Sequence, residues 1–172
     1  MATRGSFIVC VSLLVAAWTL VPAATVEPRS HQTQIVANMG ARKVVVQTST
    51  APNNYTSSNF VQVTAAVVEV PPGENGFFLA TFNAESRCSG EEGSWCSVRI
   101  VCDGIELLPK SGVDFAFNSP GGSTWKSASI IRRSQLKTGG SHVCAVETLQ
   151  VDGRSEHLLD DWLFVIEYWR RN

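Results

Sequence analysis

Residues 77–102 read FFLATFNAESRCSGEEGSWCSVRIVC, and this stretch carries the clearest structural pattern in the chain. Near its start Phe78 and Phe82 alternate with polar positions, and after a polar loop Val98 and Ile100 do the same. An apolar residue at every second position is typical of a strand with one buried face. The stretch therefore predicts two strands that are joined by the loop.

Four cysteines constrain how these strands are linked. If the loop at 89–94 is the turn of a hairpin, Cys88 lies opposite Cys96. Cys96 and Cys102 would share one strand at a separation of roughly 20 Å, which is beyond the reach of a disulfide. Two pairings then remain, and we prefer Cys88–Cys96 with Cys102–Cys144 to Cys88–Cys102 with Cys96–Cys144, because the first closes the hairpin directly. The spacings lack the close cysteine pairs of zinc sites, which favours disulfides.

The first 23 residues have the composition of a secretory signal peptide. The positive residue Arg4 precedes an apolar run at 7–21, and cleavage is expected after Ala23 or Ala24. The run is shorter than the roughly 20 apolar residues that span a bilayer, so we expect no membrane span in the mature chain. Cys10 would be removed with the leader. The sequence therefore predicts a secreted, extracellular protein.

Beyond residues 1–23 the chain divides into two parts. Residues 24–42 are polar and unpatterned, which predicts a flexible N-terminal segment. Residues 43–172 alternate short β-branched and aromatic runs with Gly and Pro turns. This pattern predicts a single all-β domain, an antiparallel β-sandwich of the jelly-roll type, held by two disulfides. The expected strands are 43–48, 60–64, 66–70, 77–85, 95–102, 113–117, 125–133, 141–151 and 158–169.

The charge of the chain limits its partners. Without Arg4 of the leader, the sequence has 13 Lys and Arg residues against 15 Asp and Glu residues. A near-neutral surface of this kind argues against nucleic acid and against an anionic membrane as partners.

No sequence motif identifies a catalytic centre, so we predict no catalytic residues. His142 and His157 are the candidate bases, but neither belongs to a zinc-protease pattern and no nucleophile elbow is present. A hydrolase would require one of them to meet a serine and a carboxylate in one pocket. Acid pairs for glycoside hydrolysis could be drawn only from a scattered set, Asp114, Glu147, Asp160 and Asp161.

The expected last strand, 158–169, is apolar on both faces. Its even positions suit the core, whereas its odd positions still include several large apolar residues, among them Leu163, Val165 and Trp169. Two explanations stay open. Either the strand is central and covered on both sides, or its outer face meets a partner subunit and the protein is a homo-oligomer.

Several stretches resemble a group of uncharacterised secreted bacterial β-sandwich proteins. They are the cysteine loop CSGEEGSWCSVRI at 88–100, Asp103-Gly104, GVDFAF at 112–117 and Leu159-Asp160-Asp161-Trp162. The group has no established activity to carry over. The last stretch is also similar to the closing strand of jelly-roll carbohydrate-binding modules, in which the aspartates often support a structural calcium ion.

Three functions remain open. The first is a non-enzymatic extracellular interaction domain, whose partner is an extracellular protein or a further copy of the chain. The second is a carbohydrate- or cell-wall-binding module, with Trp95, Trp125 or Trp169 stacking on sugar rings and with Asp160 and Asp161 near a calcium ion. The third is a secreted hydrolase. No cofactor other than calcium is expected.

Overall fold

The computed structural model describes residues 32–39, 42–120, 124–151 and 156–171, so the predicted leader lies outside the described residues. The described residues contain ten strands and no helix that could cross a membrane. The strands are β1 (Gln32–Met39), β2 (Arg42–Ser49), β3 (Asn53–Tyr55), β4 (Val61–Ser89), β5 (Cys96–Cys102), β6 (Ile105–Glu106), β7 (Ala116–Asn118), β8 (Lys126–Arg133), β9 (Lys137–Gln150) and β10 (Glu156–Arg170).

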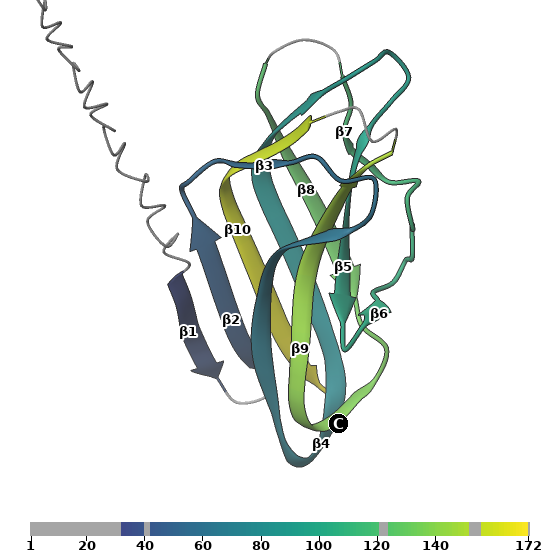
Figure 1. Ribbon diagram of the computed structural model, residues 1–172. Helices are drawn as coiled ribbons and strands as arrows, with labels where there is room; N and C mark the ends of the chain where they lie inside the picture. Colours follow the sequence, from purple (N-terminus) through teal and green to yellow (C-terminus); the bar gives the residue numbers. More distant parts are fainter. Residues whose placement is uncertain (1–31, 40–41, 121–123, 152–155, 172) are drawn as a thin grey trace, which may run out of the picture.

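The long strand β4 bends in the middle and thereby takes part in two layers (Figure 1). Its first arm, 61–70, pairs with β9, whereas its second arm, 76–89, pairs with β10 on one side and with β8 on the other. The bend is the turn expected from the sequence Pro71-Pro72-Gly73. Gly73 has a φ of 79° there, a conformation that favours glycine.

Two antiparallel layers result, and we name them front and back as they lie in Figure 1. The back layer has the order β1, β2, β10, second arm of β4, β8, and the front layer has the order first arm of β4, β9, β5, with β6 and β7 beside β5. From β2 to β10 the chain crosses repeatedly between the layers, and the resulting strand order is that of a jelly roll. The predicted all-β antiparallel fold is confirmed.

The inward-facing side chains of the two layers form one core. The back layer contributes the rings of Phe78, Phe82, Trp162 and Phe164, each at most 1% exposed. The ring of Phe82 lies 6.0 Å from that of Trp162 and 5.9 Å from that of Phe117, which belongs to the front layer. Each large side chain buried in this way stabilises the fold by roughly 1.5–3 kcal/mol. Further front-layer members of the core are Val68, Ile100 and Val146.

The two disulfides are those that the sequence favoured, Cys88–Cys96 and Cys102–Cys144. The predicted hairpin, however, is wrong, because the second arm of β4 pairs with β10 and β8 while β5 pairs with β9. Cys88–Cys96 therefore joins the back layer to the front layer, whereas Cys102–Cys144 links directly opposed residues of β5 and β9. Alternation identifies inward-facing cysteines, but two such cysteines can meet across the sandwich as well as across a hairpin.

The N-terminal segment also differs from the prediction. Gln32–Met39, which fall in the segment expected to be flexible, form strand β1 and pair with β2. An edge strand of this kind is held by backbone hydrogen bonds to its neighbour, which require no apolar alternation in the sequence.

Candidate functional site

His157, one of the two candidate bases, is buried in the core and has no exposed surface. Its Nε2 lies 2.9 Å from Ser86 Oγ, and its Nδ1 lies 2.6 Å from Thr148 Oγ1. Thr148 donates its own proton to the carbonyl of Ser97, so Thr148 Oγ1 accepts from the imidazole Nδ1–H, and Nε2 accepts from Ser86. Asn118 in turn donates to Ser86 Oγ. The chain of hydrogen bonds thus runs in one direction and fixes a neutral imidazole.

The chemistry of this cluster is structural. Burial lowers the pKa of His157 to about 3, so the ring stays neutral over the physiological range. The serine and the histidine of a hydrolase do meet here, but the third partner, Thr148, is a hydroxyl and not a carboxylate, and the whole group is closed to solvent. A substrate has no access to it, and the arrangement links the two layers instead.

His142, the second candidate base, lies on the inward face of β9 at one end of the front layer, with its ring 5.4 Å from the buried ring of Phe78. It belongs to a cluster around Asp103. The carboxylate of Asp103 accepts from Lys137 Nζ at 2.6 Å, from His142 Nδ1 at 2.8 Å and from the backbone N–H of Val143 at 3.0 Å. Partial burial acts to raise the pKa of Asp103, but these hydrogen bonds outweigh it and lower the pKa to about 2. His142 Nε2 also lies 2.8 Å from the carbonyl of Thr138. The cluster therefore ties the turn after β5 to β9.

The carboxylates considered for glycoside hydrolysis lie apart. Glu147 is on the front layer and pairs with Arg99 at 2.6 Å, whereas Asp160 and Asp161 lie on β10 of the back layer. Asp114 belongs to the connection between β6 and β7. In the part of the chain that the structure describes, no three His, Cys, Asp or Glu side chains gather as a metal site would require. The calcium site at Asp160 and Asp161 stays a prediction.

Two of the three candidate tryptophans are exposed, and they lie at opposite ends of the back layer. Trp125 precedes β8 and is 39% exposed, with the Arg87 guanidinium 5.5 Å from its ring. Trp169 is also 39% exposed, near the end of β10. Trp95 is half-buried, and its Nε1 donates to the carbonyl of Val113 at 2.7 Å. The three rings therefore do not form one platform.

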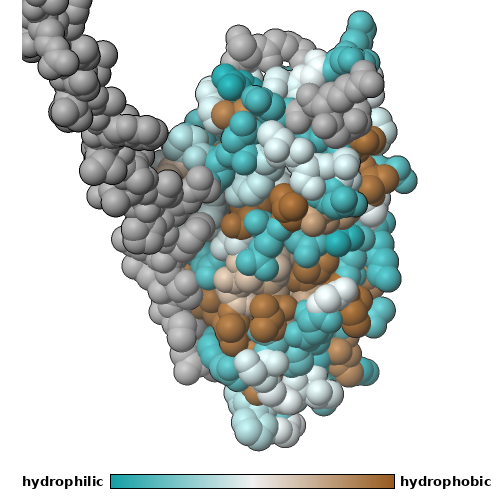
Figure 2. Space-filling view, viewed as in Figure 1, coloured by the Kyte–Doolittle hydropathy of each residue, from teal (hydrophilic) through white to brown (hydrophobic). Residues whose placement is uncertain are grey.

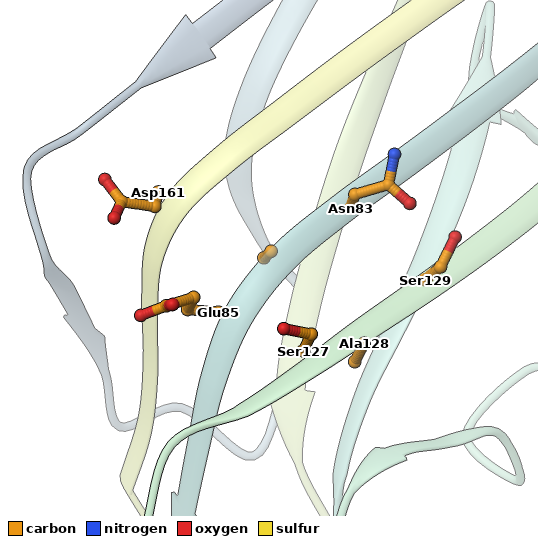
Figure 3. Close-up of a pocket in the computed structure, with 7 residues that line it drawn as sticks. Asn83, Glu85, Ser127, Ala128, Ser129 and Asp161 are labelled. Atoms are coloured by element: carbon orange, nitrogen blue, oxygen red, sulfur yellow. The ribbon is translucent and has the colours of Figure 1, made fainter.

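A shallow groove lies on the outer face of the back layer, on the same side and at the same end as Trp125. It measures about 270 Å³, and its polar lining is formed by Asn83, Glu85, Ser127, Ser129 and Asp161 (Figure 3). Asp161 has a φ of 42° and lies in a bulge, where two residues of β10 face one residue of β4. The backbone geometry of β10 thus brings a carboxylate to the rim of the groove.

The same bulge corrects the predicted faces of the last strand. The sequence placed Leu158 in the core and Leu159 on the outer face, but Leu159 is fully buried and Leu158 is partly exposed. The extra residue in the bulge resets the alternation, so that odd positions face inward before it and even positions face inward after it.

An apolar strip crosses the outer face of the back layer below the groove. Strand register places its residues in two adjacent rows, each crossing four strands. We call these eight residues the outer strip: Val46, Val165, Thr81 and Ile131 in one row, and Val44, Glu167, Leu79 and Arg133 in the next. Their neighbours along each strand face the core, so these side chains point outward.

The outer strip is not covered by any of the described strands, whose contacts are all within their own layer or across the core. Ile131 is 55% exposed, and the other apolar members are partly exposed. Strand β10 is therefore central, as one of the two explanations required, but the described residues cover only one of its faces. Ile131, Leu79 and Arg133 were not among the sequence candidates. The sequence feature that could have indicated them is the doublet Ile130-Ile131, because adjacent residues of a strand point to opposite faces and only one of the two can face the core.

The outer face of the front layer is different. Figure 2 shows this face, on which brown apolar patches are broken up by teal hydrophilic ones. Val67 and Val143 are opposed on neighbouring strands and are 52% and 50% exposed. The Arg99–Glu147 ion pair lies nearby, and the Arg99 guanidinium stacks on the ring of Phe60 at 3.7 Å.

These features define a class of protein: an all-β, antiparallel β-sandwich of jelly-roll order with two disulfides and a buried polar cluster around His157. No protein-family model matches the chain, and no curated protein matches it significantly.

Proposed function

We propose that this protein is a non-enzymatic extracellular interaction domain, and that the outer strip of the back layer is its binding surface. The observation that carries the proposal is the continuity of the strip across β2, β10, β4 and β8. Contiguous exposed apolar surface of this kind is typical of protein interfaces. The leader expected from the sequence and the two disulfides support an extracellular setting.

Hydroxyl-radical footprinting tests this proposal and does not require the partner to be identified first. The purified chain in dilute solution is compared with the chain in its native extracellular fraction. We expect Val165 and Ile131 to be labelled less in the native fraction, while Val67 and Val143 of the front layer serve as exposed controls. Equal labelling of the strip in both samples would refute the proposal.

The groove supports a second candidate, a carbohydrate-binding module. Carboxylate, amide and hydroxyl groups that line a groove near an exposed indole ring are suited to a polyhydroxylated ligand. Trp125 lies two residues before Ser127 and therefore on the same face as the groove. Glu85 and Asp161 make the groove acidic, so we expect a neutral or amino-bearing sugar and not a sulfated one.

Tryptophan fluorescence titration tests the second candidate. We expect chitohexaose or cellohexaose to change the fluorescence of the wild type and heparin to leave it unchanged. Trp125→Ala should abolish the response. Trp169→Ala is the matched control, because its ring is equally exposed but lies at the other end of the layer. A response that survives Trp125→Ala, or no response to either neutral sugar, would count against the groove as a glycan site.

A further inference from the structure

We propose that the partner that covers the outer strip is a second copy of this chain, related to the first by a two-fold axis parallel to the second arm of β4. This inference rests on the proposed function, since it assigns a partner to the same surface. It follows from the order of the strands and from where the two charges of the strip lie.

The strand order provides the geometry. In the back layer, the second arm of β4 lies between β10 and β8. When two copies face each other across a two-fold axis along that arm, β10 of one copy lies over β8 of the other, and β4 lies over β4. The rotation does not change the position of a residue along the strand direction. Each residue of β10 therefore faces the residue of β8 that shares its row.

The charges of the strip become complementary under this symmetry. Glu167 and Arg133 share one row, on either side of Leu79. The two-fold axis places Glu167 of one copy opposite Arg133 of the other, and it does so twice in each dimer. In the adjacent row it places Val165 opposite Ile131. Leu79 meets its own symmetry copy at the axis, so apolar contacts lie between the two ion pairs.

The other simple two-fold arrangement is unfavourable. An axis that runs across the strands, along the row of Glu167, would place each strand opposite itself. Glu167 would then face Glu167 of the partner copy, and Arg133 would face Arg133. Like charges that face each other in an interface cost several kcal/mol, so the register selects the axis along β4.

The groove limits the interface at one end. Glu85 is on the same arm of β4, about 13 Å along the strand from Thr81. If the contact continued that far, Glu85 of both copies would meet near the axis and repel. Twisted sheets that pack face to face diverge away from their crossing point. The dimer is therefore centred on Leu79 and Thr81, and it carries both grooves at the same end.

Charge exchange tests this arrangement. The variants are Glu167→Arg and Arg133→Glu, each analysed alone, as an equimolar mixture and as the double variant by analytical ultracentrifugation over a range of concentrations. We expect the wild type to dimerise and each single variant to dimerise about 10- to 100-fold more weakly, because two repulsive contacts replace two ion pairs. The mixture should recover dimers, and native mass spectrometry should show that they contain one chain of each kind. The double variant should also dimerise.

Glu69→Arg is the matched control, because Glu69 is an exposed glutamate on the front layer; it should leave the dimer unchanged. Thermal unfolding of every variant shows whether the fold is intact. A wild type that remains monomeric, or single variants that dimerise as the wild type does, would overturn the proposed dimer. If the strip were still protected in the native fraction, the interaction function would stand with a different protein as partner. If protection were also absent, both proposals would fall.

Discussion

The outer faces of the two layers carry exposed apolar side chains in different settings. On the front layer, Val67 and Val143 stand beside the Asp103 cluster and the Arg99–Glu147 ion pair. On the back layer, apolar residues continue across four strands with one acid and one base among them. On the front face, charged groups therefore interrupt the apolar surface. On the back face, covering the apolar residues with a partner would lower the free energy. Exposure of single side chains does not distinguish the two faces, but their arrangement does.

The largest effect is expected from the disulfides, of which Cys88–Cys96 joins the two layers and Cys102–Cys144 links two strands of the front layer. Replacing Cys102 and Cys144 by Ala should lower the free energy of unfolding by about 4 kcal/mol, and replacing Cys88 and Cys96 by about 2.5 kcal/mol, since the first pair closes the longer loop. Urea unfolding of both double variants measures the difference. A larger loss for the second pair would show that the link between the layers matters more than loop length.

The next effect is a dependence of stability on pH, which comes from His157 buried between the layers. His157 has a pKa of about 3 in the folded state, below its usual value, so the unfolded chain binds a proton first as the pH falls. The free energy of unfolding should therefore fall by about 1.4 kcal/mol per pH unit between pH 6 and 4. Urea unfolding at several pH values tests this. His157→Gln should flatten the slope; an unchanged slope in this variant would assign it to other groups.

A smaller effect separates the two outer faces directly. Ile131→Asp and Val143→Asp each place a carboxylate at a position that is at least half exposed, but on opposite layers. Both should fold, because neither side chain is part of the core. We expect Ile131→Asp to weaken self-association by about tenfold or more, equivalent to roughly 1.4 kcal/mol, and Val143→Asp to leave it unchanged. Sedimentation at matched concentrations checks this, and equal effects of the two variants would contradict the contrast between the faces.

The smallest effect concerns the Asp103 cluster, which ties the turn after β5 to β9. Asp103→Asn should destabilise the fold by about 1 kcal/mol at neutral pH, after allowance for solvent screening of this partly exposed group. The folded-state pKa of Asp103, about 2, lies below its usual value of 3.8. Its contribution is thus present above pH 3.8 and is lost as the pH falls towards 2, so the two chains should become equally stable there. A constant difference between them at all pH values would contradict this explanation.

Parts of the candidate surfaces could be predicted from the sequence and parts could not. Trp125 and Asp161 were identified as ligand candidates, and both lie at the polar end of the back layer. Glu85 and Ser127 were not identified, because a polar residue at an outward strand position looks the same whether it faces bulk solvent or a groove. Their proximity depends on the pairing of β4 with β8, which places Glu85 opposite Ser127.

The sequence by itself determined most of the strands, their inward positions and the pairing of the cysteines. These properties depend on local alternation and on the reach of a disulfide, which neighbouring residues express. Only the tertiary structure decided that Cys88 and Cys96 join two layers, that a bulge exchanges Leu158 for Leu159 in the core, and that Val46, Val165, Thr81 and Ile131 form one row. The physical reason is that register is set by contacts between distant segments, so a surface assembled across several strands leaves no periodic signal in any one of them.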